Sequence, residues 1–180
     1  MEHEEQLIER VKKNRDMNAY GILIDRYQSN LRLFIYRLTN NWDLTDDISQ
    51  DTFIKAFDNL DKYSHRNSFQ NWLMKIAHNL VRSEYRSINT VKKVFAKLFT
   101  EPSYQENWIG LTGSEQNRLN QALQSLQLGE RTAVVLNFSY DMSHQDIANW
   151  LGLPLGTVKS HIKRGMEKLR HNLGVDIGGQ

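Results

Sequence analysis

The sequence predicts an all-α protein made of two small helical domains that a flexible linker joins. Apolar residues recur at spacings of three and four along most of the chain, and few runs alternate as strands do. Only two of the 180 residues are proline, and 39% are hydrophobic, which is enough to build cores. A mixed stretch containing Pro102 and Gly110 interrupts the helical pattern. We therefore expect domains at residues 1–87 and 113–180, with a linker over 88–112 in which a short helical piece can form around Val91–Phe99.

Four helices are expected in the first domain. A short amphipathic helix covers residues 4–15, and a second helix begins where Asp16 offers its carboxylate as a cap. Two asparagines break that helix, and Asp43 then caps a third. Residues 61–67 are polar and form a loop, after which Ser68 begins a fourth helix that runs to about Arg86.

Four more helices are expected in the second domain, at about 114–125, 129–139, 143–151 and 155–173. The third of these starts at Ser143, with a carboxylate three residues further on, as in a capping box. Gly152 follows where a tight turn needs a left-handed residue. A capped helix, a glycine turn and a longer basic helix together predict a helix-turn-helix.

The last predicted helix has an apolar stripe and a basic stripe. The apolar residues are spaced by three and four: Val158, Ile162, Met166, Leu169 and Leu173. The polar face holds Thr157, Lys159, Ser160, Lys163, Arg164 and Arg170. A helix that packs its apolar side and presents a basic N-terminal half is suited to the major groove of a duplex. An ordinary amphipathic surface helix is the alternative, and the capped partner and turn glycine favour DNA binding.

The fourth predicted helix carries a polar stripe that is suited to a nucleic acid. Its residues are spaced by four, three and four: Lys75, Asn79, Arg82 and Arg86. Just before and within its first turn, aromatic and basic side chains alternate: Lys62, Tyr63, Arg66, Phe69 and Trp72. This composition is typical of a platform on which single-stranded bases stack. Phe69 is more readily explained as core and Trp72 fits either role, whereas Tyr63, in a polar loop, is the aromatic least needed by the core.

The third predicted helix has an acidic surface shared by Asp47, Gln50, Asp51 and Ile54. Acidic residues in a first turn suit the helix dipole, which is the plain explanation. Gln50 and Asp51 lie beyond that turn, however, so we also expect a docking face for a basic protein partner.

Net charge is informative once the chain is divided. The whole chain carries 23 Lys and Arg against 21 Asp and Glu, a net charge of +2. Residues 59–100 carry 8 basic and 2 acidic side chains (net +6), and residues 159–180 carry 5 and 2 (net +3). Two separate basic zones fit a protein that touches a polyanion at two places, although solvated helix faces explain the counts equally well.

Several classes of protein are excluded or disfavoured. The chain has no cysteine, which excludes disulfides, thiolate zinc sites and cysteine nucleophiles. Its histidines lack a ligand spacing, and no glycine-rich phosphate loop appears, so we expect no metal, no cofactor and no enzyme. No run is as long as a membrane span and the first residues are acidic, so a cytoplasmic location is expected.

Three stretches together resemble the extracytoplasmic-function (ECF) sigma factors of bacterial RNA polymerase. Residues Thr45–Phe53 resemble region 2.2 of that family, Phe69–Leu80 resemble regions 2.3 and 2.4, and Leu151–His161 resemble the helix-turn-helix of region 4.2. The resemblance covers roughly residues 16–87 and 114–173, in the order of the family.

The resemblance implies a promoter-specificity subunit that acts on no small-molecule substrate. Its partners would be promoter DNA, core RNA polymerase through the clamp coiled coil and the flap, and an anti-sigma factor that is often membrane-bound. Polymerase binding would use Asp46, Asp47, Gln50 and Asp51. The minus-ten element would be read by Lys62, Tyr63, Arg66, Asn67, Trp72, Lys75, Asn79, Arg82 and Arg86. The minus-35 element would be read by Ser143, Thr157, Lys159, Ser160, His161, Lys163 and Arg164.

A stand-alone helix-turn-helix regulator remains the main alternative. In that case the first domain would sense a ligand or dimerise, and the protein would bind a palindromic duplex without polymerase. Dependence of promoter binding on polymerase separates the two hypotheses.

Overall fold

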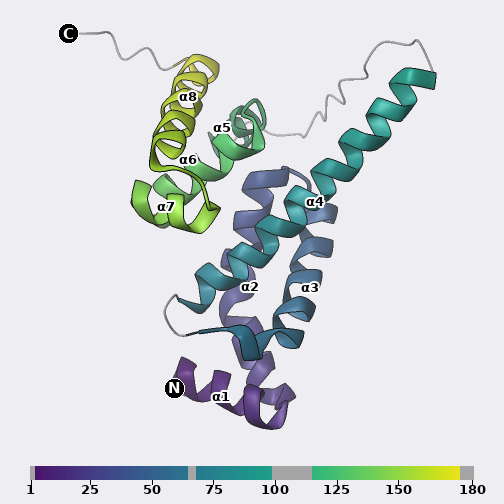
Figure 1. Ribbon diagram of the computed structural model, residues 1–180, viewed down its shortest axis with the longest axis vertical. Coiled ribbons are helices and arrows are strands. Elements are labelled where there is room, and N and C mark those ends of the chain that lie inside the picture. The colour runs from purple at the N-terminus through teal and green to yellow at the C-terminus, as the bar shows by residue number, and fades with distance from the viewer. Residues whose placement is uncertain (1–2, 65–67, 99–114, 175–180) are drawn as a thin grey trace. The chain divides into compact units, whose positions relative to one another are not determined.

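The computed structural model describes residues 3–64, 68–98 and 115–174 (Figure 1). Within these ranges the chain forms eight α-helices and one short 3-10 helix, and no strand. It divides into two units, Met1–Val81 and Arg82–Gln180, so the all-α fold with two domains is confirmed. The exact domain limits remain a prediction.

The first unit holds α1 (Glu4–Asn14), α2 (Met17–Thr39), α3 (Trp42–Asp58), the 3-10 helix η1 (Leu60–Lys62) and the start of α4. Asp16 caps α2 as expected, because its carboxylate accepts the Asn18 and Ala19 amides at 3.0 Å each. The predicted cap of α3 is wrong. Asn41 is the cap, and its side chain accepts the Leu44 amide at 3.0 Å, while Asp43 lies in the first turn of the helix.

The core of the first unit lies where α1, α2, α3 and α4 meet. Its fully buried residues include Leu7, Ile8, Leu23, Phe34, Ile35, Leu38, Phe69 and Leu73. In Figure 1, α2 and α3 run side by side and α1 lies at one end of this pair, next to η1. The spacing of apolar residues in each helix accounts for this packing, because it places them along one stripe.

Helix α4 (Phe69–Leu98) is longer than the sequence suggested. Ser68 precedes the helix and caps it, because its hydroxyl accepts the Asn71 amide at 3.2 Å. The predicted end at about Arg86 is wrong, because residues 88–98 of the expected linker continue the same helix rather than forming a separate short piece. The helix contains neither glycine nor proline that would stop it. The rest of the expected linker, residues 99–112, lies outside the described residues.

The second unit holds α5 (Glu115–Gln124), α6 (Leu128–Tyr140), α7 (His144–Leu151) and α8 (Leu155–Leu173), close to the four predicted helices. Its core includes Ala133, Leu136, Ile147, Val158 and Leu169. Arg131 is buried in this unit at 4% exposure. Its guanidinium donates to the carbonyl oxygens of Gln124 and Leu126 at 3.0 Å each, which satisfies the end of α5.

The predicted helix-turn-helix is confirmed in α7 and α8. Ser143 caps α7 by accepting the Asp146 amide at 3.1 Å, and Asp146 in turn accepts the Ser143 hydroxyl at 2.6 Å. Gly152 follows α7 with a φ of 69°, a left-handed conformation that favours glycine. Its amide donates to the Ala148 carbonyl, which ends α7 and turns the chain into α8.

Candidate nucleic-acid interface

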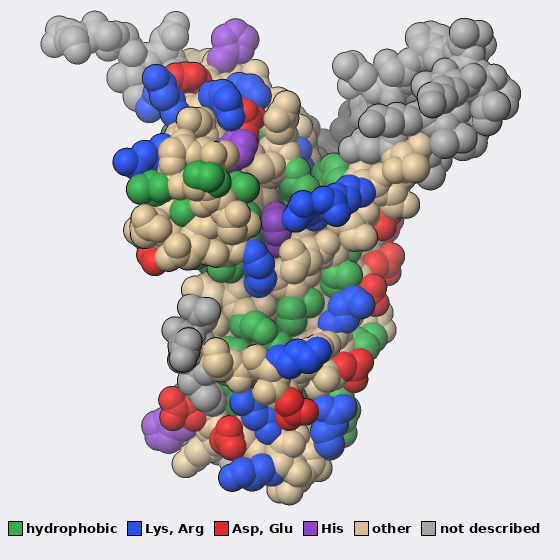
Figure 2. All heavy atoms as spheres, in the orientation of Figure 1, with side chains coloured by type: hydrophobic (Ala, Val, Ile, Leu, Met, Phe, Trp, Pro, Cys, Tyr) green, Lys and Arg blue, Asp and Glu red, His purple; other side chains and the backbone are tan. Residues whose placement is uncertain are grey.

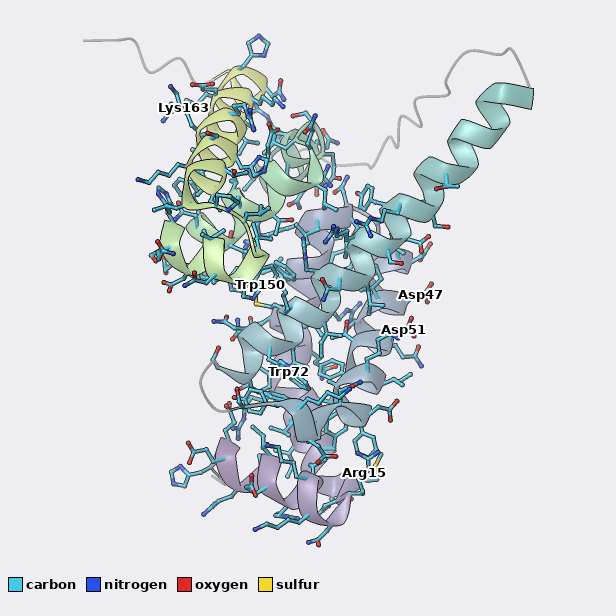
Figure 3. All side chains as sticks on the ribbon, in the orientation of Figure 1. Arg15, Asp47, Asp51, Trp72, Trp150 and Lys163 are labelled. Atoms are coloured by element: carbon cyan, nitrogen blue, oxygen red, sulfur yellow. The ribbon has the colours of Figure 1, made fainter. Side chains whose placement is uncertain are left out.

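All four residues predicted to bind a protein partner are exposed along α3: Asp46, Asp47, Gln50 and Asp51. Figure 2 shows Asp and Glu side chains in a row over this helix, and Figure 3 labels two of them. Asp46 forms an ion pair with Arg32 of α2 at 2.5 Å. Asp47 and Asp51 form no ion pair with any residue in the described ranges, so their charges are available to a partner.

A groove between α2 and α3 lies beside these acidic residues. Its volume is about 500 Å³, and it is lined mainly by apolar side chains, together with Asp46, Gln50 and the Arg32 that pairs with Asp46. Met17 and Ile54 in its lining are 64% and 52% exposed. The sequence predicted Ile54 on the acidic face but not the groove, because the α2 side of it depends on how the two helices pack. An apolar patch rimmed by charges is typical of a protein interface.

Tyr63 is buried, at 5% exposure, so the expectation that the core needs it least is wrong. Its ring meets Phe69 edge-on at 5.4 Å between centroids and lies tilted against Trp72 at 5.3 Å. Lys12 of α1 donates its Nζ to the Tyr63 carbonyl at 2.9 Å, which holds the chain after η1 in place. Burial raises the pKa of the Tyr63 hydroxyl above its ordinary value. The polar sequence around Tyr63 concealed a packed aromatic cluster.

The other residues predicted to read a single strand occupy varied environments. Lys62 is exposed, and its Nζ donates to the Asn59 side chain at 2.7 Å. Trp72 is half-buried. Arg66 and Asn67 lie outside the described residues.

The polar stripe predicted on the fourth helix lies on α4. Asn79, Arg82 and Arg86 are exposed there, and Lys75 is half-buried. Helical spacing of four, three and four keeps all four on one face of α4. This stripe is therefore presented as the sequence predicted.

The basic residues of α8 fall into two groups. Lys159 and Lys163 are exposed and make no ion pair with any residue in the described part of the chain (Figure 3). Figure 2 shows Lys and Arg side chains spread along this helix. Thr157 is half-buried near its start. Because their charges are uncompensated, the two lysines are the strongest candidates for contact with phosphates.

The remaining predicted duplex readers are engaged within the protein. The Ser143 hydroxyl caps α7, and the Ser160 hydroxyl donates to the Gly156 carbonyl at 2.9 Å. His161 is half-buried, and burial lowers the pKa of its imidazole below the ordinary value, as does the nearby Arg164 charge.

Arg164 forms an ion pair at 3.3 Å with Glu130, a buried residue that sequence reasoning missed. The available signal was the spacing of Gln127 and Glu130 at the start of α6, which forms a capping box in the structure.

In the described part of the chain, these surfaces are accompanied by neither a metal-ligand cluster nor a membrane-spanning helix. Among the described residues, no three His, Cys, Asp or Glu side chains gather as they would around a metal ion. Within the same ranges, no helix is both long and apolar enough to cross a bilayer.

Comparison with known families identifies both units. Residues 23–90 match the model of Sigma-70 region 2, and residues 116–169 match that of Sigma-70 region 4. The chain belongs to the ECF sigma factors. It is 32% identical to the ECF RNA polymerase sigma factor SigW of Bacillus subtilis, over 92% of this chain and 94% of that protein. It is also 30% identical to the ECF sigma-E factor of Salmonella typhimurium, over 91% and 90%.

Solved structures that resemble this ECF sigma factor include two complexes. The sigma factor RpoE of Bartonella quintana, in complex with the anti-sigma factor NepR, matches with a TM-score of 0.71 and 25% identity, over 87% of this chain and 98% of that one. CnrH, in complex with the cytosolic domain of CnrY, matches with a TM-score of 0.66 and 25% identity, over 96% and 98%.

The family determines the role of the protein. ECF sigma factors direct core RNA polymerase to specific promoters and initiate transcription, so the chain is a transcription initiation factor that binds promoter DNA. A stand-alone helix-turn-helix regulator does not account for the match of residues 23–90 to region 2.

Proposed function

We propose that this ECF sigma factor docks on the clamp coiled coil of the largest polymerase subunit through α3. The observation that supports this role is the exposed pair Asp47 and Asp51 beside an apolar groove that Asp46 and Gln50 help to line. Acidic side chains around an apolar centre complement a basic helical partner, because charges steer association and apolar burial stabilises the complex.

The minus-ten element is read from α4 and the chain that precedes it. Asn79, Arg82 and Arg86 supply hydrogen bonds and positive charge along one exposed face, and half-buried Trp72 supplies an aromatic surface. Lys62, Tyr63, Lys75 and the undescribed Arg66 and Asn67 complete the proposed set. Extruding a base costs a few kcal/mol, so stacking and polymerase contacts must offset that cost.

The minus-35 element is read by α8 in the major groove. Lys159 and Lys163 contact phosphates, while Thr157 and Ser160 lie near the start of the helix, where side chains reach base edges. Ser143 and His161 complete the proposed set, whereas Arg164, which the sequence also placed in it, is held by Glu130. Region four also touches the polymerase flap. The proposed domain limits are 1–87 and 113–180.

An anti-sigma factor, often membrane-bound in this family, holds the protein inactive. The support is that two of the similar solved structures are complexes, one with an anti-sigma factor and one with the cytosolic domain of CnrY. The protein acts by binding rather than by catalysis, in the cytoplasm, where polymerase and DNA are found.

Reconstitution with core polymerase tests the proposed function. The full chain is mixed with core enzyme, and run-off transcription is measured on fragments of the source genome. We expect transcripts from a small set of promoters that appear only when both components are present. Sequence-specific binding of the same fragments without polymerase, and no transcripts with it, would instead indicate a stand-alone regulator.

A further inference from the structure

Glu130 carries a buried carboxylate where α6 meets the duplex-reading helix α8. Its side chain is only 3% exposed. Lys168 donates its Nζ to Oε2 at 2.6 Å, and the Arg164 Nε lies 3.3 Å from Oε1. Both cations come from α8, so one carboxylate ties two successive turns of that helix to α6. A buried carboxylate needs such partners, because an unpaired charge there is strongly destabilising.

The backbones of α6 and α8 approach closely at this point. Next to Arg164, a Cβ atom added to Gly165 would lie 2.7 Å from a Val134 methyl group. One turn earlier on α8, the His161 ring lies 3.4 Å from the position of a Cβ at Gly129. The crossing therefore leaves little freedom for α8 to slide or roll, and the carboxylate of Glu130 lies within it.

Arg164 and Lys168 differ from the lysines at the start of α8. Their side chains are 55% and 43% exposed, so each retains a path to solvent. Their charges are nevertheless opposed by Glu130, and Arg164 also lies 3.3 Å from the His161 Nδ1. Lys159 and Lys163 have no such partner among the described residues. Near its start the helix thus carries two lysines available to phosphates, with exposed Arg170 in its last turn, whereas a carboxylate holds Arg164 and Lys168.

We propose that Glu130 is a positioning residue for duplex recognition, which holds Arg164 and Lys168 away from DNA phosphates and sets the register of α8 on α6. This inference rests on the proposed role of α8 in reading duplex DNA. With both cations held, sequence-independent attraction is limited to the other basic residues of the helix. Phosphate contacts carry no sequence information, so limiting them weakens binding to random DNA and increases the preference for promoter DNA.

The test is the salt dependence of binding to a 20-base-pair duplex of arbitrary sequence, measured by fluorescence anisotropy with the full chain. Glu130→Gln preserves size and removes the charge that holds both cations. We expect the slope of log K against log salt to steepen by about 0.9 for each cation that reaches a phosphate, and by about 1.8 for both. Glu167→Gln is the matched control, because it removes one exposed acid from α8 itself. If Glu130→Gln and Glu167→Gln gave the same slope of log K against log salt, the proposal would be overturned.

A comparison of two lysine variants tests the proposal if Glu130→Gln fails to fold. Lys168→Met should leave the slope unchanged, because that cation is held by Glu130, whereas Lys163→Met should reduce it by about 0.9. Equal reductions in both variants would overturn the proposal. A purely structural role for Glu130 would change thermal stability and leave these slopes alone. Transcription by the wild-type chain is assayed separately, so failure of the proposed function is distinguishable from failure of this inference.

Discussion

In the second unit, Lys159 and Lys163 stand exposed on α8, whereas in the first unit Tyr63 lies buried between Phe69 and Trp72. A duplex groove accepts a rigid helix, and charged side chains are well solvated before DNA arrives. Stacking on a single strand needs aromatic faces, and exposing those faces to water costs about 25 cal/mol per Å² of apolar area.

The two units therefore differ in whether the side chains proposed to contact DNA are exposed in the free protein. Region four presents its phosphate-binding lysines in the free protein, on a helix that Gly165 and Glu130 hold against α6. Region two covers Tyr63 with its own aromatic residues and with α1. If Tyr63 stacks on a base, the chain after η1 must first rearrange, whereas half-buried Trp72 is already accessible at its surface.

The largest effect is expected from Tyr63→Ala. Removing a buried aromatic ring leaves a cavity, so the free energy of unfolding should fall by about 3–5 kcal/mol. Calorimetry of the full chain measures this change. Tyr63→Phe, which keeps the ring, is the control and should be close to wild type. A wild-type stability of Tyr63→Ala would contradict the structural role of Tyr63, and with it the difference between the two units.

Charge reversal of Asp47 and Asp51 to lysine should weaken core polymerase binding about a hundredfold or more. Like charges placed opposite each other at an interface cost several kcal/mol, and each 1.4 kcal/mol is tenfold in affinity. Affinity is measured by titration with labelled core enzyme. Asp25→Lys, an exposed acid on α2, is the matched control. Unchanged affinity in the double variant would exclude this face as the docking surface.

Trp72→Leu should reduce the free energy that stabilises the open complex by about 1–3 kcal/mol, which is the contribution of one stacked base. Leucine keeps apolar packing against Phe69 while removing the flat surface. Permanganate reactivity of promoter thymines reports strand opening. Trp42→Leu provides the control, because Trp42 is exposed on α3, stacked on Tyr36, and lies outside the proposed reading surface. Normal reactivity with Trp72→Leu would assign Trp72 to the core alone.

Replacing Lys159 and Lys163 by alanine should flatten the salt dependence of duplex binding by about 1.8, or about 0.9 for each phosphate that is no longer neutralised. Because both side chains are exposed, thermal stability should change little. Lys13→Ala, an exposed lysine of α1, is the control. A slope identical to that of wild type would mean that region four presents no preformed phosphate contacts.

The smallest effect concerns acid stability. Burial acts to raise the pKa of Glu130, but the Lys168 hydrogen bond and the Gln127 amide outweigh it, and the pKa lies below its ordinary value. A carboxyl with a lowered pKa in the folded state contributes stability that is present above its unfolded pKa, about 4.3, and is lost as pH falls. The difference in unfolding temperature between wild type and Glu130→Gln should therefore be larger at pH 7 than near pH 4. A difference independent of pH would contradict this.

Much of the fold follows from local patterns. The spacing of apolar residues predicted each described α-helix to within a few residues, apart from the end of α4. The short 3-10 helix η1 was missed, because a loop was expected from residue 61. Asp16, Ser143 and Gly152 act at the helix ends where their chemistry suits them. The cap of α3 was misplaced because Asn41 and Asp43 are both good capping residues only two positions apart. The end of α4 was misplaced because its polar composition resembled a linker, although nothing in it breaks a helix.

In the candidate site, too, features within one helix were predictable from the sequence and contacts between helices were not. The acidic row on α3, the polar stripe on α4 and the lysines of α8 each lie within one helix, where a period of 3.6 residues places them on a common face. The sequence by itself therefore determined the helices, the family and which side chains share a surface. Tertiary structure decided which of those side chains are available. Burial of Tyr63 depends on α1, and the ion pairs of Arg164 depend on Glu130, because contacts between helices distant in the sequence leave no periodic pattern in it.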